Sequence, residues 1–369
     1  MDLLNSTGMQ AAFTQGVDKN GRESLVVVVK GTFRIPLDGS EATLAEVQKP
    51  LVMADTFTSE PGYSAPVYEA DFSPIKPRCD VLLVGSAHAP KGEPVTKLPV
   101  GLKVGSLVKS FNVIGDREWE VNGLLVTPGR PRPFLKMSIT YDRAYGGNDN
   151  FHFDPNEHSA FMANPIGIGY RRHLIDIAGT SVPNTEEMDS PITSPKGEYR
   201  PMSLGVVGRH WQSRAPFAGT YDQHWIDNVF PFLPSDFDNQ YFQAAPPDQQ
   251  IPYLLGGEEV VLGNLAPQER IFFRLPKVDV PIVFFYKKGG RLETSGVIDT
   301  LVIEPDEGVF TLCWRASLPL KKNMFEITQV LTGKMSRGWW RARELGKTWQ
   351  PSLAHLVNAN KAATEEDES

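Results

Sequence analysis

Alternating hydrophobic and polar positions mark two stretches of the chain as strands with one face toward a core. Residues 133–142 (PFLKMSITYD) place Leu, Met, Ile and Tyr on one face and Lys, Ser, Thr and Asp on the other. Residues 309–317 (VFTLCWRAS) place Phe, Leu, Trp and Ala opposite Thr, Cys and Arg. This period of two is typical of β-strands. Apolar runs predict further strands at 24–35, 80–87, 270–275, 281–287 and 297–303.

Polar segments with Gly or Pro separate these strands, for example KKGGRLE at 287–293 and EPDEG at 304–308. Such segments are turn signals. Strands that follow one another without intervening helices favour antiparallel sheets packed as a sandwich over alternating βαβ units. We therefore predict a mainly-β protein with an antiparallel β-sandwich-like body.

The middle of the chain has a different character. Residues 151–250 hold 11 of the 30 prolines and 14 of the 37 aromatic residues, without sustained periodicity. So many aromatic side chains are not compatible with a solvated, disordered segment. We predict a long, irregular, aromatic- and proline-rich insertion folded over the sheets. Short helical turns are expected at 157–163 and at 235–245, the latter with Ser235 as its N-cap.

The last part of the chain predicts two short helices. One covers 335–346 and ends at Gly346, and the other begins at Pro351 and runs to about Ala363, before an acidic tail. The predicted organisation is an N-terminal β segment (1–147), the insertion (148–265), a C-terminal β segment of the same body (266–332), and the C-terminal helices with the acidic tail (333–369).

Composition narrows the classes of function. The formal net charge is −7, the opposite of the sign expected for a protein that binds nucleic acid. No apolar run approaches the roughly 20 residues that span a bilayer, and the first residues lack the pattern of a secretion signal. Cys79 and Cys313 are far apart and belong to no CxxC pattern, which predicts buried free thiols. We expect a cytoplasmic protein that neither binds nucleic acid nor inserts into a membrane.

Catalytic and metal-binding motifs do not occur. His152, His158, His210 and His224 lack the spacings of zinc or iron ligands, and GxSxG is absent. Gly167-x-Gly169 lacks the remaining features of a dinucleotide or phosphate loop, and a tight turn explains it. We therefore predict no catalytic residue, no cofactor and no metal. Paired carboxylates at Asp236 and Asp238, with Asp222 nearby, leave a carbohydrate-active β-sandwich hydrolase as an alternative.

Two clusters of tryptophan and arginine are candidate partner-binding sites, because these residue types dominate binding hot spots. The first contains Trp211 and Arg214, and the alternative for it is an internal staple of the insertion. The second contains Trp339, Trp340, Arg337, Arg341 and Arg343. Adjacent residues of a helix diverge by about 100°, so the two tryptophans cannot both face one core. One of them must be half-exposed or covered by another part of the chain, while the alternative is simple packing with solvated arginines.

The stretch SITYDRAYGGND (138–149) is predicted to be a structural joint formed by Arg143, Tyr145, Gly146 and Gly147. If the strand alternation continues, Arg143 points inward and needs an acidic partner. Asp222 or Asp236 from the insertion is the expected partner. The two glycines let the chain turn into the insertion without strain at a Cβ atom.

Five motifs occur in order: ITYDRAYGG, NPIGIGY, RHWQSRAPFAGTYDQHW, PSDFDNQYFQAAPPDQQ and LLGGEEVVLGNL. Together they resemble a bacterial family known as domain of unknown function 2169, over roughly residues 1–320. The resemblance implies a cytoplasmic adaptor or chaperone encoded beside type VI secretion components. Such a protein binds a toxic effector and helps to load it onto the spike through a VgrG or PAAR protein. The resemblance supplies no catalytic residue that could be carried over to this chain.

The leading hypothesis is therefore a non-enzymatic adaptor or chaperone whose partners are a type VI effector and the PAAR or VgrG spike proteins. A hydrolase would instead require a cleft with two carboxylates about 5–10 Å apart beside an exposed aromatic residue. A structural component of the secretion particle would form stable symmetric assemblies.

Overall fold

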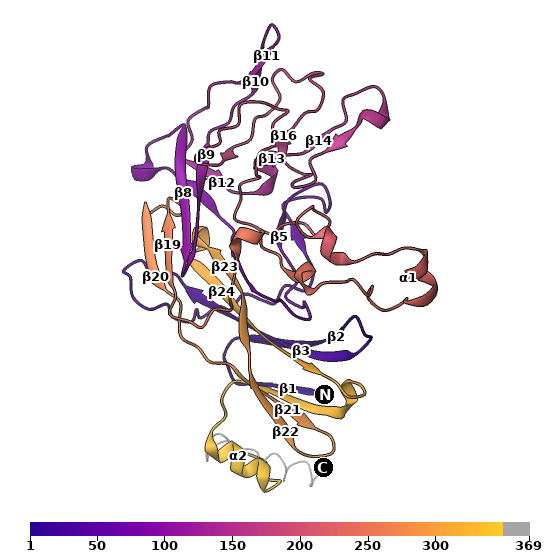
Figure 1. Ribbon diagram of the computed structural model, residues 1–369. Helices are drawn as coiled ribbons and strands as arrows, with labels where there is room; N and C mark the ends of the chain where they lie inside the picture. Colours follow the sequence, from indigo (N-terminus) through magenta and orange to yellow (C-terminus); the bar gives the residue numbers. More distant parts are fainter. Residues whose placement is uncertain (350–369) are drawn as a thin grey trace, which may run out of the picture.

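The computed structural model describes residues 1–349 and has the mainly-β fold that the sequence predicts (Figure 1). Three sheets form the body. The largest has the strand order β18 (Gln250–Ile251), β6 (Cys79–Leu83), β23 (Val297–Glu304), β24 (Val309–Pro319), β3 (Glu23–Arg34) and β2 (Gln10–Val17). The second has the order β17 (Thr185–Glu186), β9 (Leu107–Ile114), β8 (Lys97–Val104), β19 (Glu259–Gly263) and β20 (Arg270–Arg274). The third has the order β1 (Asp2–Asn5), β25 (Ile327–Thr332), β21 (Pro281–Tyr286) and β22 (Arg291–Ser295).

Smaller elements connect and cover these sheets. The two-stranded pairs are β4 (Thr56–Phe57) with β5 (Pro66–Tyr68), β7 (Ser86–His88) with β12 (Lys136–Ser138), β10 (Trp119–Asn122) with β11 (Leu125–Pro128), β13 (Tyr145–Gly146) with β16 (Ile168–Gly169), and β14 (Asn148–Asp149) with β15 (Ser159–Ala160). The α-helices of the described part are α1 (Gln223–Asn228) and α2 (Arg337–Glu344). Neither has the length and apolar character needed to cross a bilayer.

One hydrophobic core joins the three sheets. Phe310 of β24 stacks against Phe33 of β3 and against Phe273 of β20, with ring centroids 5.4 and 5.3 Å apart. The first contact lies within the six-stranded sheet, and the second reaches the five-stranded sheet that faces it. Phe284 of β21 brings the four-stranded sheet into the same core. This face-to-face packing is the sandwich arrangement expected for sheets with one apolar side.

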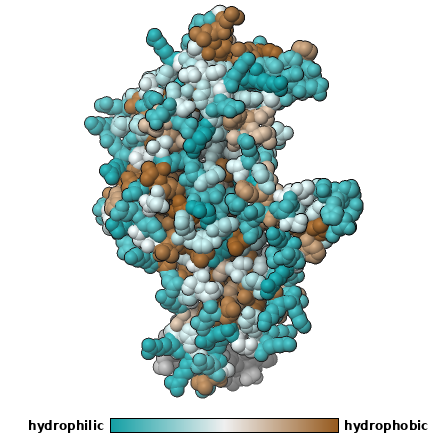
Figure 2. All heavy atoms as spheres, viewed as in Figure 1, coloured by the Kyte–Doolittle hydropathy of each residue, from teal (hydrophilic) through white to brown (hydrophobic). Residues whose placement is uncertain are grey.

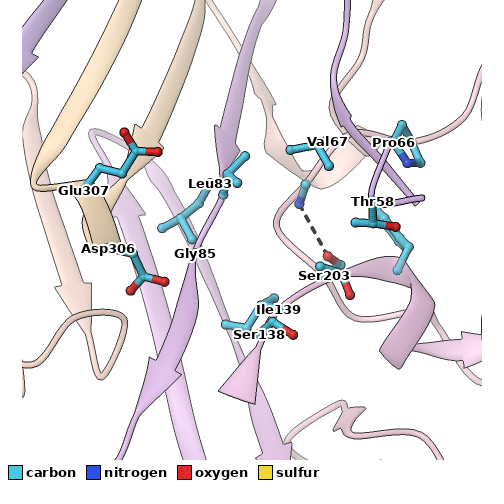
Figure 3. A pocket seen from close by; sticks show the side chains of 14 residues that line it. Thr58, Pro66, Val67, Leu83, Gly85, Ser138, Ile139, Ser203, Asp306 and Glu307 are labelled. Carbon is cyan, nitrogen blue, oxygen red and sulfur yellow. Dashed lines mark hydrogen bonds between the residues drawn. The ribbon is translucent and has the colours of Figure 1, made fainter. Parts of the chain in front are cut away.

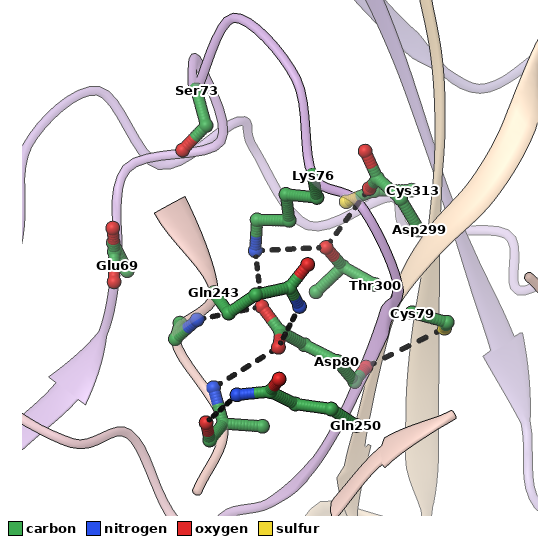
Figure 4. Close-up of polar contacts among 12 residues, drawn as sticks. Glu69, Ser73, Lys76, Cys79, Asp80, Gln243, Gln250, Asp299, Thr300 and Cys313 are labelled. Atoms are coloured by element: carbon green, nitrogen blue, oxygen red, sulfur yellow. Dashed lines mark hydrogen bonds and ion pairs between the residues drawn. The ribbon is translucent and has the colours of Figure 1, made fainter. Parts of the chain in front are cut away.

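The other face of the six-stranded sheet is buried as well, and it carries polar side chains beside apolar ones such as Val28 and Leu82. Asp80 of β6 has no exposed surface and accepts hydrogen bonds from the Lys76 ammonium (2.7 Å), the Gln243 side chain (2.7 Å) and the backbone N–H groups of Ala244 (2.8 Å) and Ala245 (3.1 Å) (Figure 4). A buried carboxylate requires such partners. Asp80 therefore fastens the insertion to the back of the sheet.

Ion pairs continue across this buried face. The Lys30 ammonium lies 3.0 Å from Asp71, and the Arg315 guanidinium lies 2.5 Å from Asp299. Burial raises the pKa of both cysteine thiols on this sheet, Cys79 and Cys313, which are free and enclosed as expected. Strand β24 is thus covered on both sides, although its sequence alternates like a strand with one solvated face.

Most predicted strands are confirmed, with two differences. The run at 80–87 divides into β6 and β7. The alternation at 133–142 was extended too far, because the chain forms a strand only at β12 and then a 3₁₀ turn at Tyr141–Arg143. Strands β8 and β9 were not predicted, although Lys97–Val104 alternates between exposed and buried positions.

The helical predictions are partly wrong. Residues 157–163 contain strand β15 instead of a helix, and the turn within 235–245 is a 3₁₀ segment, Asn239–Phe242, capped by Asp238 rather than Ser235. The sequence interpretation missed α1, while α2 ends close to Gly346 as expected. The second C-terminal helix, at 351–363, lies outside the described residues. The segment assigned to the insertion also supplies β17, β18 and β19 to the main sheets.

Candidate partner-binding surface

Helix α2 packs its tryptophan pair onto the four-stranded sheet. Trp339 is buried with Phe285 of β21, and the rings of Trp339 and Trp340 meet edge to face at 4.9 Å. The Arg291 guanidinium lies 4.4 Å from the Trp340 ring centroid, so another part of the chain covers the second tryptophan. The Arg343 guanidinium lies 3.7 Å above Phe285. These contacts attach the helix to the body.

The three arginines of helix α2 differ in their exposure. Arg337 and Arg341 are exposed, whereas Arg343 is half-buried and donates a 2.5 Å hydrogen bond to Gln329. Burial and the nearby Arg291 charge lower the pKa of Arg343. Within this cluster, Arg337 and Arg341 are therefore the side chains that a partner could reach without unpacking the helix.

Trp211 and Arg214 were predicted to bind a partner, and the structure places both in the interior instead. Trp211 packs edge to face against Tyr141 at 4.9 Å and is 1% exposed. Arg214 is 2% exposed, and its guanidinium donates to both Glu69 oxygens at 2.7 and 2.9 Å. It also donates to the backbone carbonyl groups of Val207 and Tyr241. A side chain with all its donors used inside the protein offers no surface to a partner.

Tyr145, Gly146 and Gly147 lie at the joint between the body and the insertion. The Tyr145 hydroxyl donates toward the backbone carbonyl of Pro195 at 3.0 Å. Gly146 has φ 150°, and a Cβ atom at this position would lie 2.1 Å from the Asn164 carbonyl oxygen. The motifs YGG and NPIGIG thus interlock, because strands β13 and β16 from these two motifs run parallel in direct contact.

Arg143 does not have the environment that the sequence predicted. The 3₁₀ turn at Tyr141–Arg143 ends the strand alternation, so Arg143 is half-exposed rather than inward. Its guanidinium lies 3.3 Å from Asp116 and 3.0 Å from the Asn184 side chain. The acidic partner is therefore Asp116, and neither Asp222 nor Asp236.

We expect Arg143→Ala to lower the free energy of unfolding by only about 1 kcal/mol, because exposed ion pairs contribute little. Chemical denaturation measures this change. Asp116→Asn serves as the matched control, since it removes the charge on the other side of the pair. A loss of several kcal/mol for Arg143→Ala alone would contradict the half-exposed position.

The three carboxylates of the hydrolase alternative each accept a hydrogen bond from a backbone N–H group. Asp222 caps α1 by accepting from the Trp225 N–H (2.9 Å), and Asp238 accepts from the Gln240 N–H (2.8 Å). Asp236 accepts from the Thr220 N–H and hydroxyl at 3.0 and 2.8 Å, and these hydrogen bonds lower its pKa. Helix and turn capping accounts for Asp222 and Asp238, while Asp236 joins the two ends of the segment 220–236.

A pocket of about 280 Å³ does contain two other carboxylates, Asp306 and Glu307, across from Ser138 and Ser203 (Figure 3). Both acids have cationic partners. Asp306 lies 2.6 Å from the His88 imidazole and 3.0 Å from the Lys136 ammonium. The Ser86 hydroxyl also donates to Asp306, and these interactions hold the pKa of Asp306 below its usual range. The cluster ties the β7–β12 pair to the turn before β24.

An arm formed by residues 219–236 carries α1 and projects from the body (Figure 1). Its surface is largely polar with a few apolar side chains (Figure 2). Helix α1 buries none of its residues. Four apolar side chains of the arm are about half or more exposed: Tyr221 51%, Ile226 55%, Phe230 66% and Phe232 47%. Sequence reasoning noted the aromatic content here but had no signal for its exposure.

The arm is nevertheless ordered by its own contacts. The Thr220–Asp236 hydrogen bonds close its base. Trp225 packs edge to face against Tyr221 at 4.7 Å, and its indole N–H donates to the Phe232 carbonyl at 2.9 Å. An apolar surface that the chain builds rigidly and leaves uncovered is typical of an interaction site.

Comparison with known families assigns the chain to one of them. Residues 20–315 match the model of a family described as "Uncharacterized protein conserved in bacteria (DUF2169)". The chain belongs to this family. No curated protein sequence and no solved structure matches the chain. The DUF2169 match includes the arm and ends before α2, so the arm is the candidate surface within the family region.

Several residues of the DUF2169-like motifs have structural roles. Gln249 is fully buried and donates to the backbone carbonyl groups of Val81 and Leu204, which joins the insertion to β6. Gly256 approaches Pro276 so closely that a Cβ atom would lie 2.6 Å from its carbonyl oxygen. Among residues 1–349, no group of three His, Cys, Asp or Glu side chains has the arrangement of a metal site.

Proposed function

We propose that this protein is a non-enzymatic adaptor or chaperone of the bacterial cytoplasm. It binds a type VI secretion effector, or the PAAR or spike-binding part of one, and helps to load it onto the VgrG spike. The observation that carries the proposal is the arm, whose four apolar side chains remain 47–66% exposed within residues 1–349. The class of client comes from the resemblance of the ordered motifs to effector adaptors.

The arm suits reversible binding of an aggregation-prone client. Its aromatic side chains offer a large apolar contact area at a small entropic cost, because the Trp225 contacts already order them. Binding stabilises the client by mass action and still permits its release to the spike. Arg337 and Arg341 on α2 remain as secondary contacts, outside the region that matches the family model.

The test is co-expression of the full chain with the effector encoded beside it. We expect the Ile226→Asp/Phe230→Asp variant to lower the amount of co-purified effector about tenfold or more, since truncated or charged hot spots cost over 1 kcal/mol each. The body should keep its stability, because both side chains lie on the arm and are more than half exposed. The soluble level of the effector should fall in parallel.

Leu124→Asp is the matched control, because Leu124 is a fully exposed apolar residue on the distant β10–β11 turn. It should leave binding unchanged. If the wild-type protein neither co-purifies with the effector nor raises its soluble level, the adaptor function is wrong. Stable symmetric assemblies of the protein in light scattering would instead favour a structural component of the secretion particle.

A further inference from the structure

A groove of about 640 Å³ lies at one end of the four-stranded sheet. One wall is the turn between β21 and β22, which carries Lys287 and Lys288. The other wall is the segment before β25, which carries Lys321, Lys322 and Phe325. Its volume lies within the range of ligand-binding sites. The groove thus places two pairs of ammonium groups on two separate loops.

Backbone hydrogen bonds hold the two walls together. The Lys287 N–H donates to the Glu326 carbonyl oxygen at 2.8 Å. The Glu326 carboxylate accepts from the Lys321 N–H at 2.6 Å, and the Asn323 side chain accepts from the Phe325 N–H at 3.1 Å. The groove is therefore built before any ligand arrives, which reduces the entropic cost of binding.

The charge of the groove opposes that of the whole chain. None of the four ammonium groups forms an ion pair with an acidic side chain among residues 1–349, whereas the full sequence has a net charge of −7. The single acid that lines the groove, Glu326, is engaged with the backbone of Lys321. Four uncompensated cations in one concave site attract an anionic ligand.

The geometry favours an extended acidic chain over other anions. A single phosphate is usually held by an arginine fork or by converging backbone N–H groups, and the groove offers separated lysine side chains instead. A nucleic acid would extend beyond the groove over a predominantly acidic protein. Phe325 is 76% exposed at this site and offers an apolar contact that a peptide side chain can use.

We propose that this groove binds an extended acidic segment of a partner protein. Its carboxylates lie against the two lysine pairs, and one apolar side chain packs on Phe325. The site shares no lining residue with the arm and does not depend on the adaptor function, so an adaptor could use both sites at once. The experiment below contains no effector, so its failure leaves the proposed function untouched.

Fluorescence anisotropy with a labelled Glu-Glu-Glu-Glu-Phe peptide tests the site on the full chain. We expect saturable binding that weakens about tenfold in the Lys287→Glu/Lys321→Glu variant. Binding should also weaken as ionic strength rises from about 0.01 to about 0.15 M, because exposed charges are screened. The matched control is Lys91→Glu/Lys196→Glu, which changes the net charge equally at two exposed lysines outside the groove. It should retain wild-type affinity, and equal losses in both variants would overturn the site.

Two further probes decide the occupant. Oligothymidylate binding should not weaken in the groove variant. If the wild-type protein binds oligothymidylate more tightly than it binds the peptide, the groove is a nucleic-acid site. The chain also has acidic residues of its own, Glu365, Glu366, Asp367 and Glu368. If E365Q/E366Q/D367N/E368Q binds the peptide tenfold more tightly, these residues occupy the groove and the partner assignment is wrong. Unchanged affinity supports the proposal.

Discussion

Arg214→Ala is expected to lower the free energy of unfolding by about 3–5 kcal/mol, the cost of breaking a buried ion pair by removing one partner. The guanidinium neutralises Glu69, which is itself almost fully enclosed, and also satisfies the carbonyl groups of Val207 and Tyr241. Its removal leaves four acceptor atoms without this donor. Chemical denaturation followed by tryptophan fluorescence measures the change.

Arg214→Lys is the informative companion variant. A lysine keeps the positive charge but cannot donate to two carboxylate oxygens and two carbonyl groups in one plane, so it should recover only part of the loss. Arg209, whose guanidinium also lies 2.7 Å from Glu69, limits the damage in both variants. A variant with normal stability and impaired client binding would show that Arg214 belongs to a binding surface after all.

Gly146→Ala should cost about 3 kcal/mol or more. The glycine has φ 150°, and the new Cβ atom would meet the backbone carbonyl oxygen of Asn164 at 2.1 Å. Neither atom can move freely, because Asn164 is buried and its side chain donates to Tyr141 and Tyr145. Overpacking and backbone strain therefore add to each other.

Gly179→Ala separates these two contributions. Gly179 also has a positive φ, 78°, but nothing lies within 4 Å of a Cβ atom built there. It should cost about 1–2 kcal/mol, the penalty for a left-handed residue alone. Equal losses for both substitutions in the same denaturation experiment would show that the YGG motif needs only its backbone conformation, and not the contact with NPIGIG.

The sequence predicted those secondary-structure elements whose hydrophobic pattern or composition can be recognised within the element itself. Strand β24 alternates cleanly because one side faces a core, and a β-branched run marks β3. The helix at α2 was visible from its composition and from Gly346. The insertion was also recognised, because its many prolines and aromatic residues exclude disorder and its sequence has no sustained periodicity.

The site was predicted less well, and the reason differs from residue to residue. Trp211 and Arg214 have the composition of a hot spot, but the same residue types also form buried staples. Only their burial separates these roles. Arg143 was placed inward because the alternation was extended by a few residues past a 3₁₀ turn that no proline or glycine announces. The exposure of the arm has no sequence signature, since its aromatic residues resemble those of the buried insertion.

Local sequence alone thus determined the class of fold, the positions of the main strands and the membership in a family defined by ordered motifs. Tertiary structure decided which polar and aromatic residues are available to a partner. Lys30, Asp80 and Arg315 look like solvated positions of strands, yet residues 71–73 cover Lys30 and Arg315 and the insertion covers Asp80, whereas Phe230 looks like core and is exposed. The physical reason is that exposure depends on which distant segment covers a side chain, and the pairing of distant segments is not encoded in the periodicity of either one.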